Sequence, residues 1–259
     1  MSTVLQKLLH TLAGAVGEKR CSLCSAVLPP ENLQDGLCSD CLQHLAEEAS
    51  LPCPGCGNPV SACLCGNTGL SPLHIFLGDR TWLAHTWYCP DNPDRITEKL
   101  LLSCKRKYSY TLSCHIAKVM AADLAVLLPK EKRKDWILTY APRSSGGYAR
   151  HGFDQCEEIV RQMGVLLGVP VRQMLRRTGG QEQKTMENAG QREANIADAF
   201  AAVRVPKGCR ILLFDDIITT GATMRAAGHT LADAGAGAVF PLAYAKTMPP
   251  RWRSKTEQT

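Results

Sequence analysis

The sequence lacks an apolar run long enough to cross a membrane. A spanning helix takes about 18 to 20 consecutive apolar residues, and the apolar leading segment, residues 1–20, is interrupted by Lys7 and His10. We therefore expect a cytoplasmic protein without stable membrane insertion. Apolar residues recur at helical spacing between positions 4 and 16, which favours an amphipathic N-terminal helix over 1–20 rather than a signal peptide.

Aromatic and basic side chains are scarce near the N-terminus. Residues 19–69 contain no Phe, Tyr or Trp, and Lys19 and Arg20 are their only basic residues. A segment without stacking rings or a cationic surface is poorly suited to single-stranded nucleic acid. The whole chain of 259 residues has a formal net charge of +6, which mildly favours anionic ligands without requiring them.

The same N-terminal segment is rich in cysteine, with eight of the chain's 13. They form three C-x2-C pairs and one C-x-C pair: Cys21 and Cys24, Cys38 and Cys41, Cys53 and Cys56, Cys63 and Cys65. This spacing predicts two structural zinc sites of four thiolates each, made by sequential quartets rather than a cross-braced set. A disulfide cluster would require an oxidising compartment. His44 is a possible substitute ligand.

Composition divides the chain into segments. Residues 58–80 are rich in Gly, Pro and Ser, which suggests a boundary near position 70 between a double zinc-ribbon module over 21–70 and a larger domain over 81–246. The basic tail, 247–259, is expected to be flexible. In the larger domain we expect strands over 82–89, 136–141, 169–175, 211–214 and 237–245. We expect helices over 94–104, 114–128, 155–167 and 224–234.

The most informative stretch is residues 207–224, KGCRILLFDDIITTGATM. Four apolar residues, 211–214, predict a strand buried on both faces, and a small-residue loop then leads into a helix. The hydroxyls of this loop and the free amides of the helix N-terminus would suit a phosphate. The preceding carboxylates of Asp215 and Asp216 repel phosphate but suit the vicinal hydroxyls of a sugar with Mg²⁺ nearby. The implied ligand is a ribose 5-phosphate; the alternative is an ordinary surface turn.

A second loop has the chemistry of another anion site. Residues 142–155 are glycine-rich and basic, and backbone amides near Gly146 and Gly147, with Arg143 and Arg150, could hold a pyrophosphate. A flexible linker is the alternative. Residues 176–198 form a polar run that is longer than an ordinary connecting loop, which suggests a mobile lid.

The string DDIITTGAT closely resembles the phosphoribosyl pyrophosphate (PRPP) motif of type I phosphoribosyltransferases. With the cysteine pairs and both loops, the chain resembles the ComF family from residue 21 to residue 245. An RGFNQ-like signature of that family corresponds to residues 151–155, where His151 replaces the usual arginine and Asp154 the usual asparagine. The family's Q…R…N…F loop corresponds to Gln181, Arg192, Asn195 and Phe200.

The resemblance implies an α/β fold, with a type I phosphoribosyltransferase-like parallel sheet, helices on both faces and a small cysteine-rich zinc-ribbon module before it. It implies Mg²⁺ bound with PRPP, in addition to structural Zn²⁺. The catalytic candidates are Asp215, Asp216 and Lys184, with Arg176 and Arg177 as further lid residues. The PRPP-binding candidates are Asp215, Asp216, Thr219, Thr220, Gly221, Ala222, Thr223, Arg143, Ser144, Gly146 and Arg150.

Three functions remain open at this stage. The first is a phosphoribosyltransferase that acts on an acceptor the sequence does not name, because no residue stands out as a nucleophile or general base. The second is a single-stranded DNA-binding module for DNA uptake, with uptake helicase proteins as partners, as the family's association with competence implies. The third is a regulator that senses PRPP without turnover.

Overall fold

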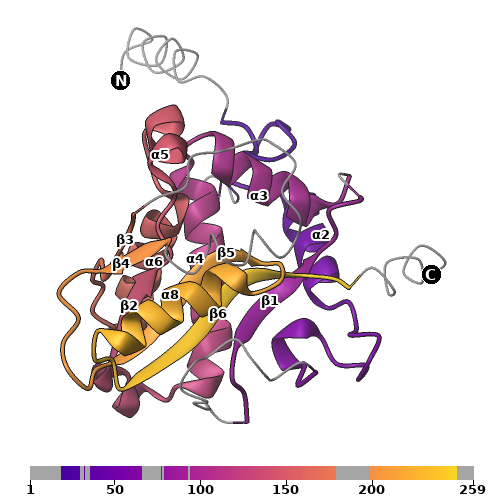
Figure 1. Cartoon of the computed structure of the whole chain (residues 1–259). Helices are drawn as coiled ribbons and strands as arrows, with labels where there is room; N and C mark the ends of the chain where they lie inside the picture. The colour runs from indigo at the N-terminus through magenta and orange to yellow at the C-terminus, as the bar shows by residue number, and fades with distance from the viewer. Residues whose placement is uncertain are drawn as a thin grey trace, which may run out of the picture.

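A four-stranded parallel sheet organises the computed structural model, which describes residues 19–29, 32, 36–65, 77, 79–92, 94–178 and 199–249 (Figure 1). The strand order is β1-β6-β5-β2. The bounds are β1 Leu83–Tyr88, β2 Trp136–Tyr140, β5 Arg210–Ile218 and β6 Ala238–Thr247. Predicted helix 1–20 and most of the tail lie outside the described residues.

Strand β5 is the buried centre of this sheet. It pairs in parallel with β2 on one side and with β6 on the other, so that Phe214 lies opposite both Tyr140 and Leu242. Its residues 211–214 are all 0% exposed, because helices cover both faces of a parallel sheet. The predicted core strand is therefore confirmed, and it runs on through the two acids to Ile218.

Helices cover the sheet on both faces. Helices α4 (Tyr110–Leu127) and α6 (Gln155–Leu167) pack against each other on one face, and α8 (Ala222–Asp233) lies across the other face on β5 and β6 (Figure 1). Helix α3 (Ile96–Arg106) follows the edge strand β1. Alternating residues of the strands face the two layers, which places Leu212 in one core and Leu213 in the other.

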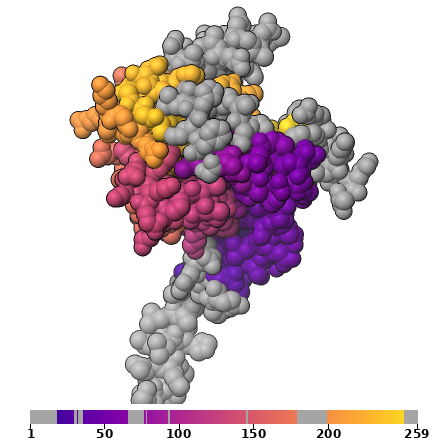
Figure 2. Space-filling model, turned by 90° about the horizontal axis from the view of Figure 1, so that it is seen from below, coloured from indigo at the N-terminus to yellow at the C-terminus, as the bar shows by residue number. Residues whose placement is uncertain are grey.

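The cysteine-rich segment packs closely on this body. It contains α2 (Ser39–Ala49) and a short 3-10 helix, η2 (Val60–Ala62), both of which contact β1. Figure 2 shows these purple residues side by side with the magenta helices of the body. The predicted fold class is confirmed: the chain has a parallel α/β sheet with helices on both faces, and a cysteine-rich module precedes it.

Helix α4 is long and apolar enough to cross a membrane by length and composition alone, and it is the single such helix in the described part of the chain. Its sequence contains Lys118 and Asp123. Its inner face, with Ile116, Met120 and Leu124 each 0% exposed, packs in the core beside α6. The helix is therefore amphipathic in its packing, with one face in the core and Val126 82% exposed on the other.

The strand predicted over 169–175 differs from the structure. Val171 makes only an isolated parallel bridge to Leu138, and the chain then leaves the sheet. A short strand β3 (Leu175–Arg177) pairs antiparallel with β4 (Phe200–Ala202) in a separate ribbon. The carbonyl of Pro170 accepts from the N–H of Leu138, but Pro170 has no N–H to donate, so the pairing with β2 does not extend toward the N-terminal side of Val171.

Candidate functional site

A cavity of about 450 Å³ opens at the carboxyl edge of the sheet. Ligands of open α/β sheets bind at this edge because loops from neighbouring strands meet there. The lining includes half of the residues predicted for the catalytic and PRPP-binding site, while Thr220, Gly221 and Ala222 are not part of it. The predicted residues that line it are Arg143, Ser144, Asp215, Asp216, Thr219 and Thr223, joined by Tyr88, Lys105, Ala141, Pro142, Asp154, Gln155, Cys156, Arg177 and Ile217.

The two acids at the end of β5 have different surroundings. The Oδ1 of Asp215 accepts a hydrogen bond from the backbone N–H of Asp216 at 2.9 Å, and the thiol of Cys156 points to the same oxygen at 4.0 Å. Burial, and then the charge of Asp216, raises the pKa of Asp215 to about 8. Without a ligand, Asp215 therefore holds a proton at neutral pH for much of the time.

Asp216 is held by two side chains from other elements. The Nζ of Lys105, in the last turn of α3, lies 3.2 Å from its Oδ2, and the Nε2 of Gln155 donates to the same oxygen at 2.7 Å. Burial opposes the charge on Lys105, but the Asp216 carboxylate outweighs it and the pKa of Lys105 is raised. The orientation of the Asp216 side chain is thus fixed by these two contacts, and only 6% of its surface is exposed.

Residues 219–221, where the sequence predicts a phosphate site, form the turn between β5 and α8. Gly221 caps α8 with φ of 81°, a left-handed conformation that favours glycine. The Oγ1 of Thr220 accepts from the N–H of Ala222 at 3.3 Å, while Thr219 and Thr223 line the cavity. The loop is exposed at 219 and 220, so its hydroxyls and the first amides of a 12-residue helix are accessible to an anion.

The loop after β2 is more ordered than the sequence suggests. Residues Ser145–His151 form a short helix, α5, with Ser144 as its N-cap; the Ser144 side chain accepts from the N–H of Gly147 at 3.1 Å. A Cβ on Gly147 would lie 2.7 Å from Cγ of Arg143, so this glycine makes room for that side chain. Gly146 and Arg150 are exposed on the helix and do not line the cavity.

The guanidinium of Arg143 is largely engaged with the protein itself. Its Nη2 donates to the carbonyl of Lys105 at 2.9 Å and its Nη1 to the carbonyl of Phe153 at 3.4 Å, over whose ring it also lies at 5.3 Å. Arg143 therefore joins the loop after β2 to the end of α3. This is a structural use that the prediction of a free anion-binding arginine did not include.

Both departures from the RGFNQ-like signature have local contacts. Asp154 caps α6, and its two oxygens accept from the N–H of Arg143 at 2.7 Å and of Cys156 at 2.9 Å. An asparagine offers one acceptor oxygen, so a carboxylate suits this double role. Burial raises the pKa of Asp154. The Nδ1 of His151 lies 3.3 Å from the carbonyl of Arg106, at the end of α3.

The predicted lid lies mostly outside the described residues, Lys184, Gln181, Arg192 and Asn195 included. Its two ends form the β3–β4 ribbon. Arg177 lines the cavity, with its guanidinium 5.2 Å from the centre of the Phe200 ring and its buried Nε without a hydrogen-bond partner among the described residues. Arg176 is exposed on the same strand and does not line the cavity.

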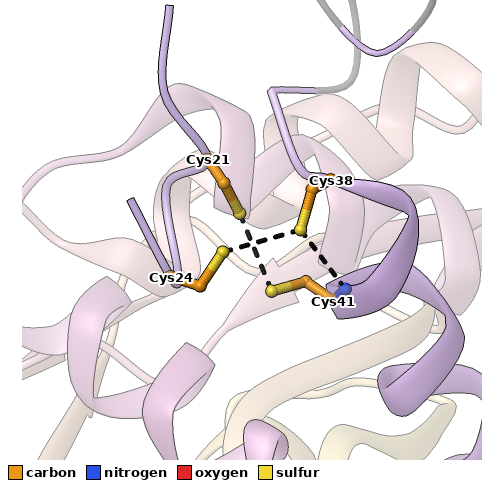
Figure 3. Close-up of side chains that lie close together, drawn as sticks. All are labelled: Cys21, Cys24, Cys38 and Cys41. Carbon is orange, nitrogen blue, oxygen red and sulfur yellow. Dashed lines mark hydrogen bonds between the residues drawn. The ribbon is translucent and has the colours of Figure 1, made fainter. Parts of the chain in front are cut away.

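The structure brings the first four module cysteines together (Figure 3). The Sγ atoms of Cys21 and Cys41 are 3.7 Å apart and those of Cys24 and Cys38 are 3.5 Å apart, and all four lie within 4.8 Å of one another. The backbone N–H of Cys41 donates to the sulfur of Cys38. Four convergent sulfurs from two C-x2-C turns match the donor set of a tetrahedral zinc site.

A second quartet forms from Cys53, Cys56, Cys63 and Cys65, again within 4.8 Å. Cys56 and Cys63 are 3.7 Å apart, and the N–H of Cys65 donates to the sulfur of Cys63. The sequential pairing is therefore as predicted, the irregular C-x-C pair included. All 13 cysteines are free of disulfides, and His44 is exposed on α2, away from both quartets.

Sequence reasoning missed the main partners of Asp216. From the sequence, Lys105 is a cation near the C-terminus of a predicted helix, and the helix dipole alone would explain a cation at that position. Only the fold shows that α3 ends beside β5. Gln155 is part of the family-like signature, but nothing in the sequence connects it with Asp216. A pattern search has no signal for either contact, since they lie 111 and 61 positions away from Asp216 along the chain.

Comparison with known proteins finds one curated relative. The chain is 26% identical over 216 residues to "Competence protein ComFC" of Streptococcus pneumoniae (strain ATCC BAA-255 / R6); the match covers 82% of this chain and 88% of the relative. No protein-family model matches the chain.

Solved structures with a partly similar fold were also found. The allosteric regulatory enzyme of purine biosynthesis is 22% identical with a TM-score of 0.35, over 51% of this chain and 25% of that one. A purine phosphoribosyltransferase from Pyrococcus horikoshii Ot3 is 15% identical with a TM-score of 0.31, over 54% and 76%. A hypoxanthine phosphoribosyltransferase from Staphylococcus aureus is 12% identical with a TM-score of 0.31, over 53% and 73%.

Proposed function

We propose that this chain, a member of the ComF family by its similarity to the pneumococcal competence protein, is a phosphoribosyltransferase-like protein that binds Mg·PRPP. One observation supports the proposal most strongly. The acids near the end of β5, the threonines around the start of α8 and the loop after β2 all line a single cavity at the carboxyl edge of the sheet, although the loop after β2 lies far from the other two in the sequence.

The ribose 5-phosphate part would occupy the β5–α8 turn. Its phosphate would bind the hydroxyls of Thr219 and Thr223 and the first amides of α8, where the dipole of the helix favours an anion. The carboxylates of Asp215 and Asp216 would accept hydrogen bonds from the ribose hydroxyls. Lys105 and Gln155 hold Asp216 in place for this role and so act as positioning residues.

The pyrophosphate part would lie toward the loop after β2. Ser144 and the cation of Arg177 line that side of the cavity, and Arg143 fixes the loop in position. The oxygen donors of the two acids and the threonine hydroxyls suit Mg²⁺, which prefers oxygen ligands and commonly binds with a substrate phosphate. When bound, the metal would supply positive charge that stabilises the departing pyrophosphate.

In a transfer reaction the bond between the anomeric carbon and the pyrophosphate oxygen breaks, and pyrophosphate leaves with the electron pair. The same carbon then forms a bond to the acceptor. Positive charge develops on the sugar and negative charge on the leaving group, so the cation of Arg177 and the carboxylates near the ribose would stabilise complementary parts of the transition state. The acceptor stays undefined in this proposal.

We further propose that both cysteine quartets hold structural Zn²⁺. Four thiolates fill a tetrahedral coordination sphere and leave no position for a substrate, so the metals would stabilise the fold rather than act in the reaction. Such thiolates persist in a reducing compartment, which is consistent with a protein of the cytoplasm.

The test is calorimetry with Mg·PRPP and with inorganic phosphate, on the wild type and on the Asp215→Asn/Asp216→Asn variant. We expect the double variant to lose most of its PRPP affinity, since each charge-assisted hydrogen bond contributes roughly 1.5–3 kcal/mol. The affinity for phosphate should change little, because the acids do not hold it. The control is Asp79→Asn, an exposed acid outside the cavity.

Equal PRPP affinity of the double variant and the wild type would contradict the proposed site. A pyrophosphate-release assay over nucleobases and amines then separates turnover from sensing: release with one acceptor indicates a transferase, and tight binding without release over the whole panel indicates a PRPP-sensing regulator.

The resemblance to the ComF family, with its association with competence, favours a second candidate, a role in DNA uptake through binding of single-stranded DNA; the curated relative is also named a competence protein. If such binding is electrostatic, its affinity should fall steeply with salt and should survive Asp215→Ala. Absence of binding at low salt would contradict it.

A further inference from the structure

A second cavity, of about 630 Å³, lies where the cysteine-rich module meets the body; we call it the junction cavity. Its walls are Ser22 and Leu23 of the first cysteine turn, one face of α3, and the turn from α3 into α4. None of the residues that line the PRPP cavity lines this one, so the two are distinct.

The charged side chains that line the junction cavity are all basic. Lys99, Arg106 and Lys107 line it, and no acidic residue is among the described residues of its wall. Among the residues that the structure describes, none of these three cations has an ion-pair partner. The dipole of α3 explains cations in its last turn but not Lys99, which is the fourth residue of this 11-residue helix. An anion would complement this wall.

The N-terminus of α4, which carries partial positive charge, also lies at the junction cavity. Ser109 caps α4, an 18-residue helix, by accepting from the N–H of Leu112 at 3.3 Å, and it lines the cavity together with the hydroxyl-bearing Ser22 and Ser103. Hydroxyl donors and a helix N-terminus beside three cations are the groups that bind a phosphate.

An aromatic side chain stands at the same wall. Tyr108 is 52% exposed, and its ring packs edge-on against Phe153 with ring centres 5.7 Å apart. This contact fixes the ring while half of its surface stays open, as a stacking partner for a flat ring requires. Leu23 and Leu102 supply apolar surface near it. A cavity of this size is in the range of about 300–1,000 Å³ that small organic ligands occupy.

We propose that the junction cavity binds a nucleoside monophosphate, with the phosphate on Lys99, Arg106 and Lys107 and the base against Tyr108. The site is separate from the PRPP cavity and does not depend on the function proposed above. It lies beside it, because the last turn of α3 contributes Lys105 to one cavity and Arg106 to the other.

The test is calorimetry of the full-length, zinc-loaded protein with AMP, GMP, CMP and UMP in turn. At least one should bind, and Arg106→Glu/Lys107→Glu should weaken it about tenfold or more, since two charge-assisted contacts become repulsive. The matched control is Lys130→Glu/Lys132→Glu, which makes the same change of charge at two exposed positions of a distant turn. The control should bind as the wild type does.

Two further variants locate the base and exclude the other cavity. Tyr108→Leu should weaken the nucleotide about tenfold but leave inorganic phosphate unchanged, as loss of stacking predicts. Asp215→Asn/Asp216→Asn should keep the junction site, whether or not PRPP binds to the wild type. Circular dichroism verifies that each variant is folded.

Three results would overturn the proposal. The first is no binding of any of the four nucleotides. The second is binding that the Arg106→Glu/Lys107→Glu variant keeps and the Asp215→Asn/Asp216→Asn variant loses, which would move the nucleotide to the PRPP cavity. The third is binding of an oligothymidylate alone, which would indicate an extended polyanion surface instead of a mononucleotide site.

Discussion

At the scale of single residues, the chemistry of the candidate site depends on how Asp216 is held. Its carboxylate is nearly buried, and a buried carboxylate is costly unless it is paired and hydrogen-bonded. Lys105 and Gln155 satisfy this requirement from two different helices. The geometry of the cavity at the carboxyl edge of the sheet therefore depends in part on residues that do not belong to the DDIITTGAT string.

Lys105→Met should accordingly weaken Mg·PRPP about tenfold or more, because Asp216 loses its cation and the cavity loses one of its positive charges. Lys130→Met is the control: it removes the same charge from an exposed position far from the cavity. Calorimetry measures the affinity of both variants for Mg·PRPP. Equal affinities would show that Lys105 only interacts favourably with the C-terminal end of the α3 dipole.

A second prediction at this scale concerns Glu98, which is 2% exposed and accepts a hydrogen bond from the N–H of Cys89. Burial raises its pKa from 4.5 to about 7. The folded state therefore binds its proton more tightly than the unfolded state. This contribution to stability is complete below about pH 4.5 and is lost as the pH rises through 7.

In Glu98→Gln, which keeps an acceptor for Cys89, the fall in unfolding free energy between about pH 4.5 and pH 7 should be smaller by roughly 1–3 kcal/mol, given ~1.4 kcal/mol for each unit of pKa. Denaturant unfolding across this range measures the difference. Parallel curves for the wild type and the variant would mean that Glu98 is not the group that titrates.

At the scale of elements, α3 connects the module to the candidate site. Its own N-cap, Arg95, makes no side-chain capping bond. Instead Glu48 of α2 accepts from the N–H of Ile96 and of Thr97, each at 3.0 Å. A carboxylate is favourable at this positive end of a helix. The module thus caps the helix whose other end carries Lys105.

Glu48→Ala should lower the unfolding free energy by about 1–2 kcal/mol, as the loss of an N-cap does. The matched control is Glu47→Ala, one position earlier on α2, whose carboxylate bonds only to the exposed Gln43 of the same helix among the described contacts. Urea unfolding with zinc present compares them. If the two variants are equally stable, the cap contributes nothing measurable.

Much of the fold could be predicted from the sequence, and the reasons are local. The apolar run 211–214 and the alternation of strands and helices specify a parallel sheet, and the C-x2-C spacing specifies the two cysteine quartets. The short helix α5 was missed because paired glycines indicate a turn, whereas Ser144 as N-cap and the basic residues of the last turn favour a helix. The strand predicted over 169–175 was wrong because the chain meets β2 only at Val171 and then pairs with β4 from Leu175 on.

The candidate site was predictable only in part. The motif residues from Asp215 to Thr223 are contiguous in the sequence, so the sequence alone reveals their motif. The contacts of Lys105 and Arg177 depend on where α3 ends and on the pairing of β3 with β4, and both of these are set by long-range packing. Roles for Asp215, Asp216 and the threonines stay predictions until a ligand is measured.

At the scale of the whole molecule, the two quartets predict the metal content. Protein purified from a reducing cytoplasm should carry about two zinc ions per chain, one for each set of four thiolates. Cys65→Ser should lower the content to about one, whereas Cys209→Ser, a cysteine outside both quartets, should not change it. Elemental analysis provides the count. Near-zero zinc in a folded protein would contradict both sites.

The quartets also lie on opposite sides of the edge strand. Cys21, Cys38 and Cys41 share a core with Leu83, whereas Cys53 and Cys63 share the other core with Trp87. Two parts of the module, α2 and η2, therefore pack against β1. A chain trimmed to begin at residue 81 would leave these apolar faces open to water and would tend to aggregate. The shared clusters of buried residues therefore predict that the cysteine-rich segment and the α/β body unfold together in a single transition.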